Sequence, residues 1–523
     1  MKPTSTNSLP RLPKMLDSNS PPRLHVAQNA SLILLSLLFL PLTTPFLFLS
    51  YAISDLINPR ALPRKRILSK RLPYGSARFH PRTILVTGVG MSKGLTLART
   101  FYLAGHNVIG ADVQPFGIPP CGRLSRALRK FYALPKPNGA DGAAFYINAL
   151  LRIVQTETVD LWVSCSGVAS AVEDGMAKEV LERRSDCVCI QFDVPTTTML
   201  HEKDTFIAET TRLGLPVPET HNVTSRAAVH KVLNESPRTK KRYIMKSVGV
   251  DDRSRGNMTV LPKRTLSETY GHLSTIPIAA DRPWVLQEFV MGKEYCTHAL
   301  VVQGVVKAFV ACPSLELLMH YEALPPDSAL SKAMLRFTQE FVGRRGGGMT
   351  GHLSFDFLIE ERVTEKGAEM GLVPIECNPR AHTAVVLFQG QEKEMADAYL
   401  SAMKPHTSSN INGFTNGDET NHQPLTPSHS AKYYWLPHDL VTLILQPLLH
   451  LLFRKISLSS YLENCRTFLE YLLLWKDGTY ELWDPLPAWW LYHVYWPGVF
   501  LASFLYGRMW SRVNVSTGKV FEC

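Results

Sequence analysis

Residues 353–357 (LSFDF) and residues 372–383 (LVPIECNPRAHT) decide the fold that this sequence predicts. The first run alternates apolar and polar residues, as a strand does, and carries Asp356. The second run is typical of a strand as far as Glu376 and then breaks at an Asn-Pro turn signal. If the two strands are neighbours, Asp356, Glu376 and Asn378 present three hard oxygen ligands at one end of a sheet.

Carboxylate and amide oxygens are ligands that Mg²⁺ takes in proteins, together with water and phosphate oxygens. Arg380 comes two residues after Asn378, and its planar guanidinium suits a phosphate or a carboxylate. The cluster is therefore predicted to bind magnesium, or Mn²⁺ in its place, together with nucleotide phosphate. The alternative is that these carboxylates only cap a turn or pair with surface lysines.

The composition is that of a folded protein with several domains. The chain has 523 residues, and 45% of them are hydrophobic, which is too many for a disordered chain. The net charge of +11 is uneven, because eight basic residues and no acid fall between residues 60 and 82. Neither zinc-finger spacing nor a basic heptad helix accompanies this run, so no nucleic-acid partner is expected.

Residues 31–53 are uncharged and long enough to cross a bilayer. The basic run follows them directly, so the positive-inside rule predicts a membrane anchor with the catalytic part facing the cytosol. Pro41 and Pro45 leave open a hairpin that dips into one leaflet. Residues 488–506 are rich in Trp and Tyr and lack charge, which fits either an interfacial aromatic belt or an aromatic helix packed on the core.

Residues 83–87 form a predicted buried strand that leads into a glycine turn at residues 88–94. A helix and a second strand ending at Asp112 follow, which predicts a Rossmann-like βαβ unit. The glycine spacing misses the G-x-G-x-x-G fingerprint by one residue. A glycine turn that lets helix and strand pack is therefore preferred over a nicotinamide site.

From residue 83 to residue 403 the order of motifs resembles that of ATP-grasp ligases. The residues that carry the resemblance are Lys203, Lys246 in YIMK, Glu288, Phe289, Val290 and Glu294 in QEFVMGKE, then Asp356, Glu376 and Asn378. The resemblance implies an α/β (α+β) ATP-grasp fold with a Rossmann-like pre-ATP-grasp domain. It also implies that the lysines hold the phosphates of ATP, that residues 288–290 bind adenine and Glu294 the ribose, and that the last three residues hold Mg²⁺. The ending N-P-R resembles the carbamoyl-phosphate synthetase branch, in which the arginine, here Arg380, touches the phosphorylated intermediate.

Further segments are similar to the mycosporine-glycine-forming ATP-grasp ligases: residues 294–298 (EYCTH), 354–357 (SFDF), 375–383 (IECNPRAHT), 484–487 (DPLP) and 514–519 (NVSTGK). This similarity implies the ATP-dependent joining of glycine to 4-deoxygadusol. His298 and His382 are candidates for binding substrate or accepting the proton of the amine. Two alternatives stay open: a carboxylate–amine ligase of another secondary pathway, and a non-catalytic, membrane-tethered nucleotide-binding protein. Residues 247–257 depart from the pattern, because they lack a glycine-rich phosphate lid.

The expected domain order is a disordered segment (1–30), a membrane-spanning or membrane-dipping segment (31–53), a basic linker (54–82), the Rossmann-like domain (83–195), the ATP-grasp domain (196–403), a disordered linker (404–432) and a helical C-terminal region (433–523), for which membrane association stays open.

Overall fold

The computed structural model describes residues 16–57, 79–137, 140–165, 167, 170–239, 241–247, 259–314, 319–364, 367–404, 423–428 and 431–523. Residues 1–15, most of the basic linker, residues 248–258, which include most of the segment that lacks a glycine-rich lid, and most of the linker at 404–432 lie outside this part of the chain.

The first domain is a five-stranded parallel sheet with strand order β3-β2-β1-β4-β5. Ile84 and Val86 in the central strand β1 enter one core, and Leu85 enters another, so the strand is buried on both faces. This explains why its sequence is a continuous apolar run. The expected Rossmann-like architecture is confirmed; its elements are β1 (Thr83–Thr87), α3 (Ser92–Leu103), β2 (Asn107–Val113), β3 (Lys130–Leu134), α4 (Ala140–Glu157), β4 (Leu161–Val163), α5 (Ala171–Arg184) and β5 (Val188–Ile190).

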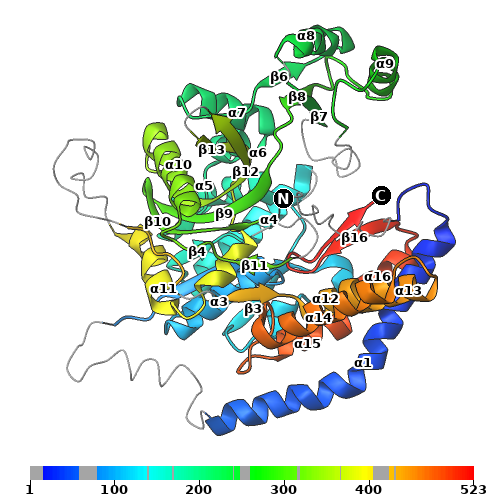
Figure 1. Cartoon of the computed structure of the whole chain (residues 1–523). Helices are drawn as coiled ribbons and strands as arrows, with labels where there is room; N and C mark the ends of the chain where they lie inside the picture. The colour runs from blue at the N-terminus through cyan, green and yellow to red at the C-terminus, as the bar shows by residue number, and fades with distance from the viewer. Residues whose placement is uncertain are drawn as a thin grey trace.

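The second sheet is antiparallel, with strand order β10-β9-β12-β13. Phe337 and Phe341 of helix α10 pack on Phe355 and Phe357 of the sheet. The other face shares a core with α3 of the first domain, so this sheet lies between two helical layers (Figure 1). Its elements are α6 (Val194–His201), α7 (Lys203–Arg212), β9 (Lys293–Val302), β10 (Val305–Pro313), α10 (Ala329–Arg345), β12 (Gly351–Thr364), β13 (Gly367–Asn378), η4 (Thr383–Phe388) and α11 (Glu392–Leu400).

A small lobe projects at the top of Figure 1. Its three antiparallel strands are β6 (Thr220–Val223), β7 (Tyr243–Ser247) and β8 (Trp284–Glu288), and helices α8 (Arg226–Thr239) and α9 (Leu266–Ser274) cover them. The lobe is inserted between α7 and β9, so it carries Lys246 toward the sheet that carries Asp356.

The C-terminal region is less purely helical than expected. It supplies β14 (Lys432–Tyr434) and β15 (Lys476–Asp477), which pair in one sheet with β11 (Tyr321–Glu322), and the hairpin of β16 (Trp510–Asn514) and β17 (Lys519–Glu522). Its helices are α12 (Leu436–Asp439), η7 (Leu440–Leu445), α13 (Gln446–Leu452), α14 (Leu458–Leu474), α15 (Leu486–Trp490), η8 (Leu491–Tyr495) and α16 (Trp496–Leu505). Tyr495, Trp496 and Phe500 are buried with Trp435 and Trp510, so for these rings the structure has the packed core and not an interfacial belt.

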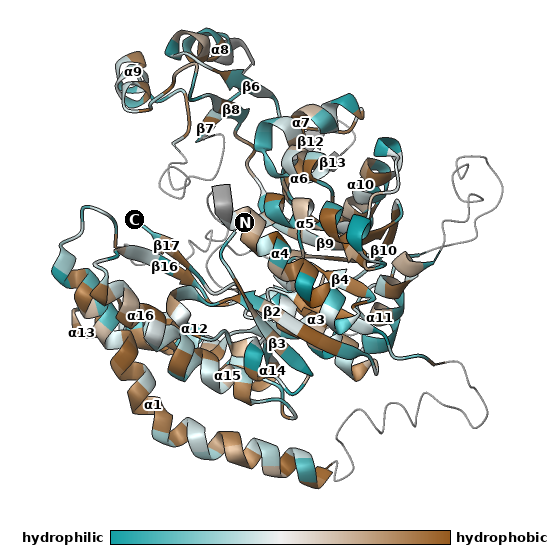
Figure 2. Ribbon diagram, turned by 180° about the vertical axis from the view of Figure 1, so that it is seen from behind, coloured by the Kyte–Doolittle hydropathy of each residue, from teal (hydrophilic) through white to brown (hydrophobic). Residues whose placement is uncertain are grey.

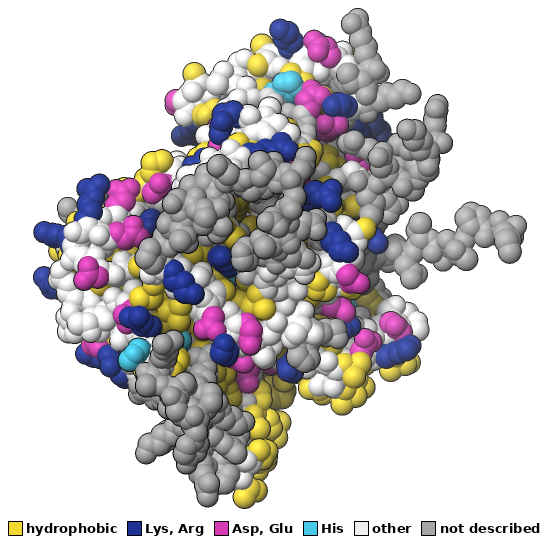
Figure 3. Space-filling model, turned by 90° about the vertical axis from the view of Figure 1, so that its left-hand side faces the viewer, with side chains coloured by type: hydrophobic (Ala, Val, Ile, Leu, Met, Phe, Trp, Pro, Cys, Tyr) yellow, Lys and Arg dark blue, Asp and Glu magenta, His cyan; other side chains and the backbone are white. Residues whose placement is uncertain are grey.

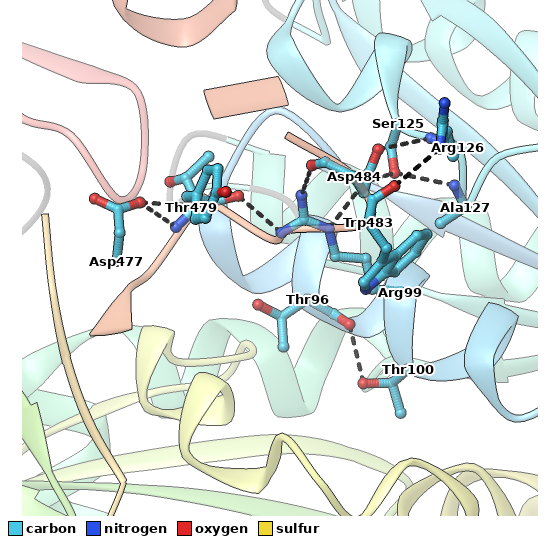
Figure 4. A network of polar contacts seen from close by, with 11 residues as sticks. Thr96, Arg99, Thr100, Ser125, Arg126, Ala127, Asp477, Thr479, Trp483 and Asp484 are labelled. Atoms are coloured by element: carbon cyan, nitrogen blue, oxygen red, sulfur yellow. Dashed lines mark hydrogen bonds and ion pairs between the residues drawn. The ribbon is translucent and has the colours of Figure 1, made fainter. Parts of the chain in front are cut away.

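A buried polar network joins this region to the first domain (Figure 4). Arg99 of α3 donates from Nε to Asp484 Oδ2 at 2.9 Å and from Nη1 to the Thr479 carbonyl at 2.8 Å. Ser125 Oγ and the Arg126 amide donate to the same carboxylate. The DPLP segment is thus a structural junction, because Asp484 satisfies buried donors from two parts of the parallel-sheet domain.

Helix α1 (Pro22–Ile57) is the one described helix that is long and apolar enough to cross a membrane. It runs below the C-terminal helices in Figure 1, and Figure 2 shows it as predominantly hydrophobic. The helix begins at Pro22, so the expectation of disorder up to residue 30 is wrong for its last residues. It continues through Pro41 and Pro45 without turning back, so these prolines make no hairpin.

Candidate functional site

The three predicted metal ligands are brought together by the pairing of β12 with β13. Asp356 lies directly opposite Glu376, and Ser354 lies opposite Asn378. A bulge follows at once, because Phe357 pairs with Pro374 and Ile375 is passed over. The Asn378 amide donates to Asp356 Oδ2 at 3.2 Å and to Glu376 Oε1 at 3.3 Å. Two carboxylates and an amide therefore converge at one end of the sheet.

This convergence is electrostatically costly unless a cation is near. Burial, followed by the charge of Glu376, raises the pKa of Asp356 well above its usual range. Within the described residues no group of three His, Cys, Asp and Glu side chains is arranged for a metal. The candidate site has instead two carboxylates and an amide. This donor set fits Mg²⁺, which takes one or two carboxylates and completes its shell with water and phosphate oxygens.

The two predicted phosphate-binding lysines reach this cluster from different parts of the fold, Lys203 from α7 and Lys246 from the small lobe. Lys203, the first residue of α7, places Nζ 3.7 Å from Glu376 Oε2. Lys246 on β7 donates to Gln287 Oε1 at 2.7 Å. Burial, followed by the positive charge of Lys203, lowers the pKa of Lys246 to about 8, while Glu376, Glu294 and Asp356 act in the opposite direction. The small lobe and the large sheet thus bring charges of both signs into one cluster.

Arg380 leaves the end of β13 beside the carboxylates. Its Nη2 donates to Asn378 Oδ1 at 2.9 Å. The Asn378 side chain thus accepts from Arg380 through its oxygen and donates to the two carboxylates through its nitrogen. Glu294, at the start of β9, accepts a hydrogen bond from Ser314 Oγ at 2.7 Å. Both residues border the cluster, as their place in the motif order predicts.

The expected adenine hinge lies at the end of β8, in the small lobe. Glu288 Oε2 accepts from the Glu219 amide and from Lys241 Nζ, each at 3.2 Å. The Phe289 amide donates to the Arg242 carbonyl at 2.6 Å, and Val290 is buried. The carboxylate of Glu288 is therefore held by Lys241 and does not join the carboxylate cluster of Asp356 and Glu376.

His298 and His382 lie next to each other. His298 is fully buried on β9, and its Nδ1 accepts from the His382 amide at 3.3 Å. His382 Nδ1 accepts in turn from the Ala384 amide at 3.2 Å. Burial lowers the pKa of each imidazole to about 3, with a further contribution from Lys93 at His298 and from Arg380 at His382. Neutral rings that cap backbone amides fit a positioning role better than proton uptake.

Sequence reasoning missed Lys93. This buried lysine of the glycine turn donates from Nζ to the Ala381 carbonyl at 3.0 Å, and burial followed by the charge of Arg380 lowers its pKa to about 7. The turn is tight: Gly88 has a φ of 72°, and a Cβ on Gly94 would lie 2.2 Å from the Gly88 carbonyl oxygen. The close packing at these glycines thus places Lys93 against the loop at residues 378–382 (NPRAH). The only sequence signal was a lysine inside a glycine-rich helix start.

The C-terminal NVST segment also reaches this loop. The Ser92 amide donates to the Ser516 carbonyl at 2.8 Å, and Ser516 Oγ lies 3.2 Å from Thr383 Oγ1. A segment more than a hundred residues away in the chain thus packs against both the glycine turn and the loop after Arg380. Its contacts are structural, and no local pattern in the sequence indicated them.

A cavity of about 750 Å³ lies between α3, the end of η4 and the C-terminal region. Arg99, Gln389, Lys432 and Glu481 are among its lining residues, and none of the predicted ligands or lysines lines it. We place the candidate site at the carboxylate cluster, because the charges that suit a nucleotide converge there.

No family model and no curated protein matches this chain. Among solved structures, N5-carboxyaminoimidazole synthetase from Staphylococcus aureus, complexed with ADP, is 14% identical over 64% of this chain and 80% of its own, with a TM-score of 0.45. The L-amino acid ligase from Bacillus licheniformis is 14% identical over 64% and 76%, with a TM-score of 0.43. A biotin carboxylase–beta-gamma-ATP complex from Campylobacter jejuni is 14% identical over 63% of this chain and 72% of its own, with a TM-score of 0.44. Similarities of this size carry no argument about what this chain does.

Proposed function

We propose that this chain is an ATP-dependent carbon–nitrogen ligase of the ATP-grasp type. The observation that carries the proposal is the meeting of Asp356, Glu376 and Asn378 with Lys203 and Lys246 between two lobes. Phosphoryl transfer needs positioning and charge neutralisation more than covalent help from the protein. Two carboxylates for a cation and two ammonium groups for phosphate oxygens meet that need.

Different residues bind different parts of the nucleotide. Lys203 and Lys246 bind phosphate oxygens, residues 288–290 receive adenine, and Glu294 binds the ribose. Asp356, Glu376 and Asn378 would hold Mg²⁺, or Mn²⁺ with the same ligands. When bound, the ion supplies charge neutralisation on the phosphates. Arg380 stabilises the charge of the transferred phosphoryl group, because its guanidinium is hydrogen-bonded to Asn378 beside the two carboxylates.

The finer part of the proposal concerns the substrates, which we take to be 4-deoxygadusol and glycine. It is supported by the sequence similarity of EYCTH, SFDF, IECNPRAHT, DPLP and NVSTGK to the mycosporine-glycine-forming ligases. An enol oxygen is a poor leaving group, so it first attacks the γ-phosphorus of ATP and releases ADP. The glycine amine then adds to the carbon that carries the phosphate ester, inorganic phosphate leaves, and the amine loses a proton. The products are mycosporine-glycine, ADP and phosphate.

His298 and His382 act in this scheme by holding the loop that carries Arg380. We also propose that α1 attaches the enzyme to a membrane, with the catalytic domains on the cytosolic side. The small-molecule acceptor and the amino acid are then collected from the cytosol.

The test uses the purified full chain with ATP, Mg²⁺, glycine and 4-deoxygadusol labelled with ¹⁸O at the enol oxygen. We expect ADP, a product with the mass of mycosporine-glycine, and ¹⁸O in the released phosphate. If ADP forms only with a carboxylic acid acceptor, the intermediate is an acyl phosphate and not an enol phosphate. The chain would then still be a ligase, with a different acceptor. Failure to bind ATP, measured by calorimetry, would refute the ligase itself.

A further inference from the structure

One face of α1 is polar and is attached to the C-terminal region along the length of the helix. Its polar residues recur at seven-residue intervals, which is two helical turns, so they share one face. Each of the four hydrogen-bonds a tail residue. The pairs are Asn29 Oδ1 with Trp510 Nε1 at 2.8 Å, Ser36 Oγ with the Tyr492 carbonyl at 2.9 Å, Thr43 Oγ1 with His493 Nε2 at 2.7 Å, and Ser50 Oγ with Tyr480 OH at 2.9 Å.

These attachments tie α1 to the folded body of the protein. The Arg126 guanidinium lies 3.9 Å from the ring centroid of Tyr51, and the Arg126 amide also donates to buried Asp484. A helix that crossed a bilayer would either carry these partners into hydrocarbon or lose the bonds, and unsatisfied polar groups there cost several kcal/mol each. The attached helix is 36 residues long, about 54 Å, well over the roughly 30 Å of a hydrocarbon core.

The opposite face of α1 is apolar and exposed. Leu34, Leu38 and Leu42 are 64%, 72% and 68% exposed, and Leu49 and Leu56 continue the same stripe. The helix is therefore amphipathic: its polar face contacts the C-terminal region, and its leucine face is exposed.

A second apolar surface lies on the same side of the molecule, where α13 and α14 form a hairpin (Figures 1 and 2). Leu452 and Phe453 at the end of α13 are exposed, as are Leu462, Leu469 and Leu473 along α14. Figure 3 shows hydrophobic side chains gathered at the lower edge of the molecule, at the height of α1. Exposed apolar surface of this kind marks an interaction site.

We propose that the outer faces of α1 and of the α13–α14 hairpin form one docking surface for a single leaflet of a bilayer rich in anionic phospholipid. In this arrangement α1 lies in the plane of the membrane, and the chain before and after it stays on one side. Charge complementarity favours lipid over a second copy of this chain. Exposed Arg454 and Lys455 stand at the hairpin tip, and the eight basic residues of the run at 60–82 follow α1. A second copy would present the same positive charges, Arg454 and Lys455, at its own hairpin tip.

The proposal does not rest on the ligase activity, and vesicle flotation of the full chain tests it. We expect the protein to float with phosphatidylcholine–phosphatidylserine vesicles and much less with phosphatidylcholine alone. Leu38→Asp/Leu42→Asp and Leu469→Asp/Leu473→Asp should each lower the floated fraction at least tenfold. Leu266→Asp is the matched control, because this leucine is equally exposed but lies on α9 in the small lobe. Unchanged flotation of both double variants would overturn the proposal, as would a lipid-free dimer that the same substitutions dissociate.

A labelling experiment separates the in-plane helix from a spanning one. Ser18→Cys lies before α1, and Ser274→Cys lies in the small lobe; both sites are exposed. Each is introduced into a chain with Cys465→Ser and Cys523→Ser and translated in the presence of sealed microsomes. A membrane-impermeant maleimide should label both sites without detergent. Protection of one site and labelling of the other would establish a spanning helix and refute the proposal.

Discussion

Lys203 Nζ lies 3.7 Å from Glu376 Oε2, so the first residue of α7 is joined by charge to the end of β13. Both side chains are partly exposed, at 20% and 35%, and both remain within reach of an arriving ligand. In the proposed function the triphosphate of ATP binds Lys203 in place of Glu376. The Glu376 carboxylate then binds a cation. The pair is therefore the point at which nucleotide and metal binding are coupled.

Glu376→Gln should abolish ADP formation while the fold is retained. The substitution keeps the shape of the side chain but removes one of two carboxylates, so we expect activity to fall by more than the roughly 100-fold that loss of an outer-shell partner of a metal site can cost. It also relieves repulsion with Asp356, so the melting temperature should stay the same or rise. Glu360→Gln on the paired strand β12 is the control. ADP release at wild-type rates in Glu376→Gln would remove the metal assignment.

Lys246 gives nucleotide binding a pH dependence. Its folded pKa of about 8 is below the ordinary lysine value, so the ammonium is present below pH 8 and is lost above it. ATP affinity, measured by calorimetry, should therefore weaken as the pH rises from 7 to 9. Lys246→Arg keeps its charge over this range and should remove the pH dependence. A wild-type affinity that stays constant from pH 7 to 9 would contradict this role.

Local sequence patterns sufficed for the parts of the site that lie on consecutive strands. The LSFDF and IECNPR runs predicted that Asp356 faces Glu376, because strand neighbours place paired side chains on one face of a sheet. The glycine turn likewise predicted the β1–α3 junction. These features follow from interactions between near neighbours in the chain or between two adjoining strands.

Long-range contacts account for what the sequence did not reveal. Lys93 reaches Ala381, Ser516 reaches Thr383, and the tail rings of Tyr495, Trp496 and Phe500 pack in a core. Each contact joins segments that become neighbours only when three parts of the chain assemble. A Trp-rich apolar helix has the same pattern whether it faces lipid or protein, so hydropathy alone could not separate the two.

The buried histidines of the site should make the protein sensitive to acid. His298 and His382 have folded pKa values of about 3, whereas unfolded histidine titrates near 6.5, so only the unfolded chain takes up these protons as the pH falls. The stabilising effect of the neutral rings is present above pH 6.5 and is lost as the pH falls toward 3. From pH 7 to pH 5 we expect a loss of roughly 2 kcal/mol per histidine in the free energy of unfolding. Urea denaturation of wild type and His298→Gln at both pH values measures it, and an equal loss in both proteins would contradict the assignment.

The Arg99–Asp484 pair should be a major source of stability. Its side chains are 4% and 0% exposed, so Arg99→Met leaves a buried carboxylate without its cation. Loss of one partner of such a pair costs about 3–5 kcal/mol. Arg82→Met breaks the exposed pair with Asp160 and should cost less than about 1 kcal/mol. Similar unfolding free energies for the two variants would show that the network does not join the domains.

Lys93→Met should separate the chemistry from nucleotide binding. Lys93 Nζ holds the Ala381 carbonyl, which lies between Arg380 and His382, and none of its described contacts is to Lys203 or Lys246. Without this bond the loop shifts and the guanidinium loses its position, so kcat should fall tenfold or more. The KM for ATP should change less than threefold, because both phosphate-binding lysines stay in place. Lys178→Met, which removes an outlying ion pair with Glu182 on α5, is the control. A parallel rise in the KM for ATP would show that Lys93 acts on the nucleotide, and an unchanged kcat would show that the glycine turn only packs.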